Sequence, residues 1–66
     1  MSSVNVGERI RQLRLGLGIS VRALAAKTGF SPSLISQAEN GQVTPSIGSL
    51  ERIAVALGVS LGKFFA

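Results

Sequence analysis

The chain has 66 residues, of which seven are basic, three are acidic and none is cysteine or histidine. A chain of this length forms one small domain, which buries only about 60% of its unfolded surface. Without cysteine and histidine it lacks thiolate zinc ligands, the commonest metal ligand and the commonest general base. Its carboxylates, Glu8, Glu39 and Glu51, are too far apart in sequence to form a local catalytic pair. We therefore predict no enzyme, no metal site and no cofactor.

The beginning of the chain lacks the basic and then apolar layout of a signal peptide. No apolar run approaches the roughly 20 residues that span a bilayer, so we expect a cytoplasmic protein with no membrane partner. The net charge of +4 is uneven, because residues 1–27 hold five basic residues against one acidic residue, whereas residues 28–66 hold two of each. A basic half suits a phosphate backbone, although an ordinary basic surface would give the same count.

A first helix is predicted over residues 6–17. Asn5 is placed to cap it, and Glu8 follows three residues later as in a capping box. The apolar stripe expected on its inner face consists of Val6, Ile10, Leu13 and Leu17. Arg14 lies four residues, or about one helical turn, after Ile10, so its guanidinium borders or enters the core. An unpaired buried charge is very unfavourable, and we expect Glu39 to be the partner.

Two short helices joined by a tight turn are predicted next, over residues 21–28 and 32–40. Gly29 falls where the chain must leave the first of them, and glycine takes the left-handed conformation of a helix end without a clash. Pro32 suits the first position of the second helix, where a missing N–H is harmless. Ala25 is small and lets the two helices approach closely. This is the pattern of a helix-turn-helix.

The helix over residues 32–40 is predicted to present a polar face. Phe30 and Ile35 have the spacing of a hydrophobic staple, which fixes the direction in which this helix begins. The side chains left away from the core are Ser33, Ser36, Gln37 and Asn40. Short, uncharged polar groups of this kind can hydrogen-bond to base edges. The alternative interpretation is an ordinary solvated helix face.

The last part of the chain predicts two more helices, over residues 47–57 and 61–66. The inner face of the longer one is expected to hold Ile47, Leu50, Ile53, Ala54 and Leu57. The expected N-caps of the four helices after the first are Ser20, Ser31, Ser46 and Ser60. Amides at the start of the helix over residues 47–57 offer a place for a phosphate. No stretch predicts a convincing strand, so the fold class is all-α with five helices.

Motifs spread over nearly the whole chain carry a family resemblance. They are Gly7-x-x-Ile10-x-x-Leu13-Arg14, Leu24-Ala25, Gly29-Phe30-Ser31, Ile35-Ser36-Gln37-Ala38-Glu39-Asn40-Gly41, Pro45-Ser46 and Leu50-x-x-Ile53-Ala54-x-Ala56-Leu57-Gly58-Val59-Ser60. This pattern resembles the DNA-binding domain of the XRE/Cro family, which has the lambda-repressor-like fold. The resemblance covers residues 6–65 and holds across four connected elements.

The resemblance implies roles for particular residues. Those matching the positions that read bases in the major groove are Pro32, Ser33, Ser36 and Gln37. Those matching phosphate contacts are Arg11, Arg22, Asn40, Thr44 and Ser46. Arg14 and Glu39 match the family's buried ion pair. Two positions depart from the family, because Pro32 stands where glutamine or arginine is common and Val21 stands where glutamine often contacts DNA.

The function implied is a sequence-specific transcriptional regulator, most simply a repressor, that binds an inverted-repeat operator in double-stranded DNA as a homodimer. The stretch from Pro32 to Phe65 also resembles regulators in which a cupin sensor domain follows, so a C-terminal sensor domain outside this chain is expected. Phe64 and Phe65 would then be a dimer contact, a domain boundary or part of the core. The competing interpretation is a protein-interaction module, similar to an antitoxin, that uses its apolar C-terminus.

Overall fold

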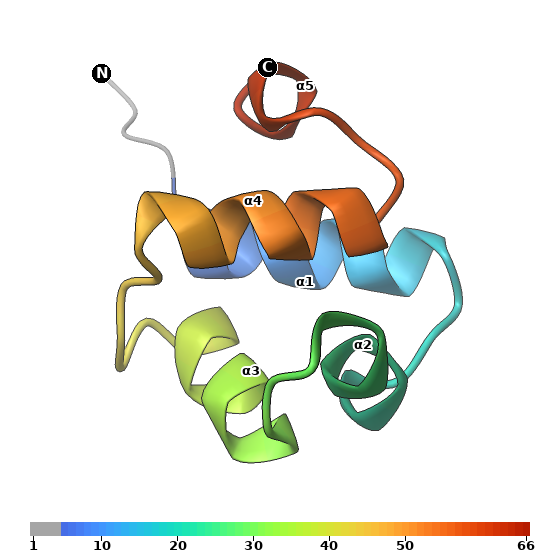
Figure 1. Ribbon diagram of the computed structural model, residues 1–66, viewed down its shortest axis with the longest axis vertical. Coiled ribbons are helices and arrows are strands. Elements are labelled where there is room, and N and C mark those ends of the chain that lie inside the picture. Colours follow the sequence, from blue (N-terminus) through green and yellow to red (C-terminus); the bar gives the residue numbers. More distant parts are fainter. Residues whose placement is uncertain (1–4) are drawn as a thin grey trace.

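The computed structural model describes residues 5–66, so the start of the predicted domain, residues 1–4, lies outside the described part. Its five helices are α1 (Val6–Gly16), α2 (Val21–Thr28), α3 (Pro32–Glu39), α4 (Ile47–Ala56) and α5 (Leu61–Phe64). Residues 5–66 contain no strand, which confirms the all-α class. In Figure 1, α1 lies behind α4, α2 and α3 lie side by side below them, and α5 lies above. Helix α3 packs against α1 and α2, and α4 packs against α2 and α5.

Each helix begins at a side chain that accepts a hydrogen bond from the backbone N–H three residues later. These N-caps are Asn5, Ser20, Ser31, Ser46 and Ser60, as predicted. A capping side chain satisfies one of the backbone donors that the first helical turn leaves unpaired. The starts of all five helices are therefore determined by local chemistry in the sequence.

Four of the helices end earlier than predicted. The last predicted residues of three of them, Leu17, Asn40 and Leu57, are C-caps instead, and in α5 the C-cap is Phe65 rather than the chain end. A cap residue contributes a backbone hydrogen bond to the helix without continuing it, so the sequence pattern extends one residue too far in α1, α3 and α4 and two residues too far in α5.

The core combines side chains from all five helices. Its buried members are Ile10, Leu24, Ala25, Ile35, Ala38, Leu50, Ile53, Ala54, Leu57 and Phe64. Two predicted core residues are wrong, because Leu17 is 53% exposed and Ile47 is 65% exposed. Leu17 is the C-cap of α1, where the chain leaves the helix, and Ile47 is the first residue of α4, next to the surface loop over residues 41–46. Both lie at helix ends that the neighbouring helices do not cover.

The two C-terminal phenylalanines have different surroundings. Phe64 is fully buried in the core, whereas Phe65 is 40% exposed, and their rings meet edge to face with centroids 5.2 Å apart. Arg9 holds this end of the chain to α1, because its Nε donates a hydrogen bond to the Phe64 carbonyl oxygen at 2.9 Å. Phe64 is thus part of the core, and of these two rings only that of Phe65 is accessible to a partner.

Helices α1 and α3 approach so closely that only glycine fits between them. A Cβ atom added to Gly7 would lie 2.2 Å from the carbonyl oxygen of Ala38 and 2.7 Å from that of Glu39. Contacts below 3.0 Å from Cβ to backbone require the backbone to move. Gly7 therefore sets the distance between α1 and the C-terminal end of α3.

Candidate nucleic-acid interface

Helix α3 presents its predicted base-reading side chains to solvent. Ile35 and Ala38 are buried, which orients the helix. The four predicted base-reading residues, Pro32, Ser33, Ser36 and Gln37, are all exposed. Since the helix has only eight residues, these four occupy most of its outer surface. The structure thus brings together one proline ring, two hydroxyls and one amide on a single exposed surface.

An apolar side chain that the sequence reasoning missed lies beside this surface. Leu34 follows Ser33 in α3, and its side chain is 36% exposed. Together with Phe30, Val43 and Ile53 it lines a pocket of about 200 Å³ between α3 and α4. Adjacent helical residues point about 100° apart, so the burial of Ile35 did not require Leu34 to be buried as well. The outer surface of α3 is therefore mixed, with one aliphatic group among polar ones.

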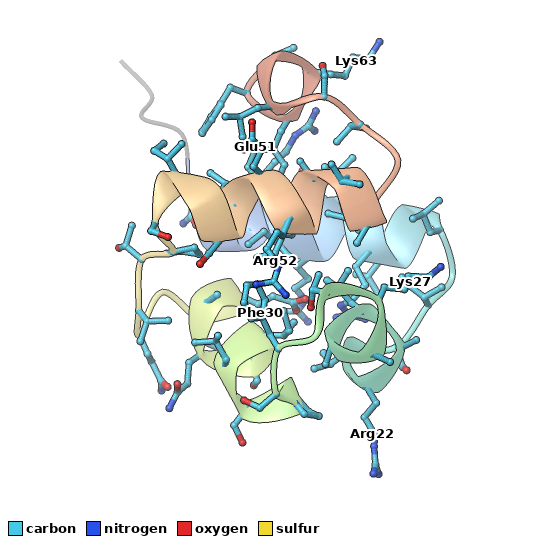
Figure 2. All side chains as sticks on the ribbon, in the orientation of Figure 1. Arg22, Lys27, Phe30, Glu51, Arg52 and Lys63 are labelled. Carbon is cyan, nitrogen blue, oxygen red and sulfur yellow. The ribbon has the colours of Figure 1, made fainter. Side chains whose placement is uncertain are left out.

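Arg22 extends from the exposed side of α2. In Figure 2 its side chain points away from the body of the domain, at the bottom of the view where α2 and α3 lie. Val21, which stands where the family often has a DNA-contacting glutamine, is half-buried. The positive charge at the start of α2 thus comes from Arg22, one residue later than the family position.

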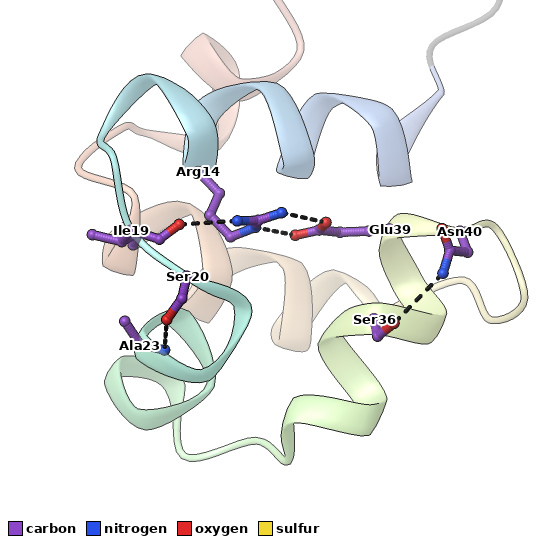
Figure 3. A network of polar contacts seen from close by, with 7 residues as sticks. All are labelled: Arg14, Ile19, Ser20, Ala23, Ser36, Glu39 and Asn40. Carbon is purple, nitrogen blue, oxygen red and sulfur yellow. Dashed lines mark hydrogen bonds and ion pairs between the residues drawn. The ribbon is translucent and has the colours of Figure 1, made fainter.

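A buried ion pair joins α1 to the end of α3 (Figure 3). Arg14 Nε donates to Glu39 Oε2 at 2.7 Å, and Arg14 Nη2 donates to Glu39 Oε1 at 3.0 Å. The third nitrogen, Nη1, donates to the Ile19 carbonyl oxygen at 2.9 Å. The two side chains are only 10% and 6% exposed. Two parallel hydrogen bonds between planar groups fix the orientation as well as the distance of the partners.

The environment of Arg14 keeps it charged. Its hydrogen bonds with the Glu39 carboxylate raise the pKa of Arg14 above its ordinary value, against the opposing effect of burial. The guanidinium therefore remains protonated throughout the physiological range. Because its third donor binds the loop before α2, one side chain links α1, that loop and α3.

Two predicted phosphate-contacting residues lie near the C-terminal end of α3. Asn40 is the C-cap of α3, and its side-chain amide lies 3.5 Å from the Ser36 hydroxyl. Arg11 is exposed and lines a small polar hollow of about 120 Å³ together with Glu39, Asn40 and Gly41. The structure thus brings Arg11 and Asn40 to one end of α3, although 29 positions separate them in the sequence.

The other two predicted phosphate-contacting residues lie at the loop before α4. Thr44 is exposed, and Ser46 is the N-cap of α4. The Ser46 hydroxyl accepts a hydrogen bond from the Ser49 backbone N–H at 3.2 Å and lies 3.0 Å from the Ser49 hydroxyl. Two hydroxyls that share one hydrogen bond leave one hydroxyl hydrogen free. Ser46 and Ser49 together can therefore offer one donor to a phosphate, beside the amides at the start of α4.

The turn between α2 and α3 has a contact that sequence reasoning missed. Arg52 of α4 donates a hydrogen bond from Nη2 to the Thr28 carbonyl oxygen. Its guanidinium carbon lies 4.5 Å from the centroid of the Phe30 ring. The sequence held no local signal for this contact, because 24 positions separate Arg52 from Thr28.

The sequence matches a known protein family. The model of a family described as helix-turn-helix matches residues 10–64, which is most of the chain. The chain belongs to this family. It is a helix-turn-helix DNA-binding domain of the XRE type, as the sequence motifs predicted.

Named relatives of this helix-turn-helix domain are regulators. The chain is 35% identical over 60 residues to the HTH-type transcriptional regulator PuuR of Escherichia coli strain K12, covering 91% of this chain and 32% of PuuR. It is 42% identical over 57 residues to the HTH-type transcriptional regulator SinR of Bacillus subtilis strain 168, covering 85% of this chain and 51% of SinR. The chain thus spans about a third of PuuR and about half of SinR.

A solved structure shows the same fold. The restriction-modification controller protein C.AhdI of Aeromonas hydrophila superposes on the helix-turn-helix domain with a TM-score of 0.88 at 32% identity, and 94% of each chain is covered. These relatives are named as regulators and a controller protein, which agrees with the expectation that the chain is no enzyme. Within residues 5–66, no helix has the length and apolar character needed to cross a membrane.

Proposed function

We propose that this domain binds double-stranded DNA sequence-specifically, with α3 in the major groove, as the reading part of a cytoplasmic transcriptional repressor. The observation that carries this proposal is the exposure of all four predicted base-reading residues on a helix whose inner side is buried. In this proposal the phosphate backbone is held by Arg22, which extends from α2, and by Arg11 with Asn40 near the C-terminal end of α3. Phosphate contacts position such a domain, and base contacts give it specificity.

The proposed complex is a homodimer on an inverted repeat. Each protomer would place α3 in one major groove, so the half-sites would lie about one helical turn apart, roughly 34–36 Å. Exposed apolar side chains are available for pairing, since Val55 is 73% exposed and Phe65 is 40% exposed. The C-terminal sensor domain inferred from the resemblance belongs to the same proposal, and the greater lengths of PuuR and SinR are compatible with it.

Selection of binding sites from a pool of randomised duplexes tests this function. We expect enrichment of an inverted repeat with half-sites about 10 base pairs apart. Enrichment of a single half-site would support base reading by α3 and contradict dimerisation by this chain alone. Salt-sensitive binding without any enrichment would contradict the proposal, because contacts to phosphates alone carry no sequence information.

Gln37→Ala should weaken binding to the selected site by about 1–3 kcal/mol and should leave binding to random DNA almost unchanged. The reason is that an amide can pair with both N6 and N7 of an adenine, whereas alanine cannot. Fluorescence anisotropy with labelled duplexes measures both affinities. Gln12→Ala makes the same chemical change on the exposed side of α1 and serves as the control. Equal losses on the selected and random duplexes would contradict a base-reading role for Gln37.

A second candidate function is a protein-interaction module. It is favoured by the exposed large apolar side chains outside α3, namely Leu15, Leu17, Ile47, Val55 and Phe65. Apolar side chains left exposed in a free domain can be covered by a partner. Size-exclusion chromatography with light scattering distinguishes the two functions, because a defined dimer fits the operator-binding proposal and a monomer that captures another protein fits this one.

A further inference from the structure

The contact between Arg52 and the helix-turn-helix turn goes beyond the roles considered so far. Figure 2 shows Arg52 reaching from α4 to Phe30 at the turn between α2 and α3. The guanidinium donates to the Thr28 carbonyl oxygen and stacks over the Phe30 ring, with 4.5 Å from its carbon to the ring centroid. One side chain of α4 therefore contacts the residues on both sides of Gly29.

These two partners are the residues that control how α2 ends and how α3 begins. Thr28 is the last residue of α2, and its hydroxyl lies 3.0 Å from the Leu24 carbonyl oxygen and accepts from the Phe30 N–H at 3.3 Å. Phe30 precedes the N-cap of α3 and is only partly buried. A side chain at that position, packed against the fourth residue of the helix, sets the direction of the helix start.

Gly29 leaves the space that this arrangement needs. Its φ is +81°, in the left-handed region, and a Cβ atom there would lie 3.0 Å from Nη2 of Arg52. Position 29 therefore favours glycine for two reasons: its backbone is left-handed, and the Arg52 guanidinium lies close to where a Cβ atom would be. The guanidinium also suits its two tasks chemically, because it is planar, stacks on an aromatic ring and donates in its own plane at the same time.

We propose that Arg52 is a positioning residue for the recognition helix, and this inference rests on the proposed function. By holding Thr28 and Phe30 together, Arg52 fixes the angle between α2 and α3. That angle determines where Gln37 lies when Arg22 is on the phosphate backbone. Arg52 thereby contributes to specificity without contacting a base.

The test compares three variants with the wild-type domain. Arg52→Ala removes both contacts, and Arg52→Lys keeps the charge but cannot stack and donate in one plane. Lys63→Ala is the control matched in charge, because its exposed side chain extends from α5, far from the turn in Figure 2. For each variant, affinities are measured for the selected duplex and for random DNA over a range of salt concentrations. Residual dipolar couplings of backbone amides give the α2–α3 angle in the absence of DNA.

We expect both Arg52 variants to change the α2–α3 angle and to reduce the ratio of selected to random affinity by about tenfold, with Lys63→Ala retaining the wild-type ratio. Equal losses on both duplexes, with a shallower salt dependence as for a lost phosphate contact, would overturn the proposal. An unchanged angle would overturn it as well.

A further variant and the dipolar couplings keep the test decisive. If Arg52→Ala does not fold, Phe30→Leu takes its place, because it removes the ring from the contact and keeps an apolar side chain in the staple. We then expect Phe30→Leu to change the α2–α3 angle. If the wild-type domain selects no DNA sequence, the proposed function fails, but the dipolar couplings still decide whether Arg52 fixes the angle.

Discussion

Replacing Gly7 with alanine should destabilise the domain by about 2–3 kcal/mol, as overpacking of a tight contact does. The added Cβ would lie 2.2 Å from the Ala38 carbonyl oxygen, and this atom belongs to the backbone of α3 and cannot rotate away. Helices α1 and α3 must therefore separate. In a domain of this size each kcal/mol corresponds to roughly 4–8 °C in the melting temperature. Thermal unfolding followed by circular dichroism measures the effect.

Gly16→Ala is the matched control for this prediction. It makes the same change on the same helix, where nothing lies within 4 Å of the added Cβ. Alanine is a better helix former than glycine, so we expect a gain of about 0.5–1 kcal/mol. A Gly7→Ala variant that melts at or above the wild-type temperature would show that α1 and α3 are not in close backbone contact.

Glu39→Leu should destabilise the domain even more, by about 3–5 kcal/mol, because it leaves the buried Arg14 guanidinium without its carboxylate. Small domains are stable by roughly 0.05–0.15 kcal/mol per residue, so this single change is expected to unfold a large fraction of the protein. Arg14→Met should have a similar effect, since it strands the Glu39 carboxylate and the Ile19 carbonyl oxygen that Arg14 now binds.

The double variant Arg14→Met/Glu39→Leu should recover most of the lost stability. Replacing both partners of a buried ion pair with apolar side chains is often neutral or stabilising, because no uncompensated charge remains. Urea unfolding of the four proteins gives a double-mutant cycle, and we expect a coupling well above 1 kcal/mol. Two single losses that simply add in the double variant would show that Arg14 and Glu39 are not energetically coupled.

The features that could be predicted from the sequence are those with a local chemical cause. Ser31 followed by Pro32 determines where α3 begins, because a hydroxyl cap and a proline at the first position both favour that start. Helical spacing placed the Arg14 charge near the core, where it requires a carboxylate, and the family resemblance implied that Glu39 is this partner. The exposure of Gln37 followed from the burial of Ile35 and Ala38 on the same short helix.

The features that could not be predicted depend on how separate helices meet. Gly7 was recognised as part of a motif, but its contact with the backbone of α3 follows only from the three-dimensional arrangement. Arg52 had no predicted role, and its contacts with Thr28 and Phe30 cross between elements. Leu17 and Ile47 fit apolar stripes, yet periodicity does not tell where a helix end passes beyond its neighbours.

The close approach at Gly7 also has an electrostatic consequence. Gly7 lies in the first turn of α1, and the carbonyl oxygens that it meets belong to the last two residues of α3. The aligned peptide dipoles of a helix leave a partial positive charge at its N-terminus and a partial negative charge at its C-terminus. The positive end of α1 therefore lies against the negative end of α3, with no side chain between them. This attraction involves no ionisable group, so it persists unchanged at every pH at which the two helices themselves are formed.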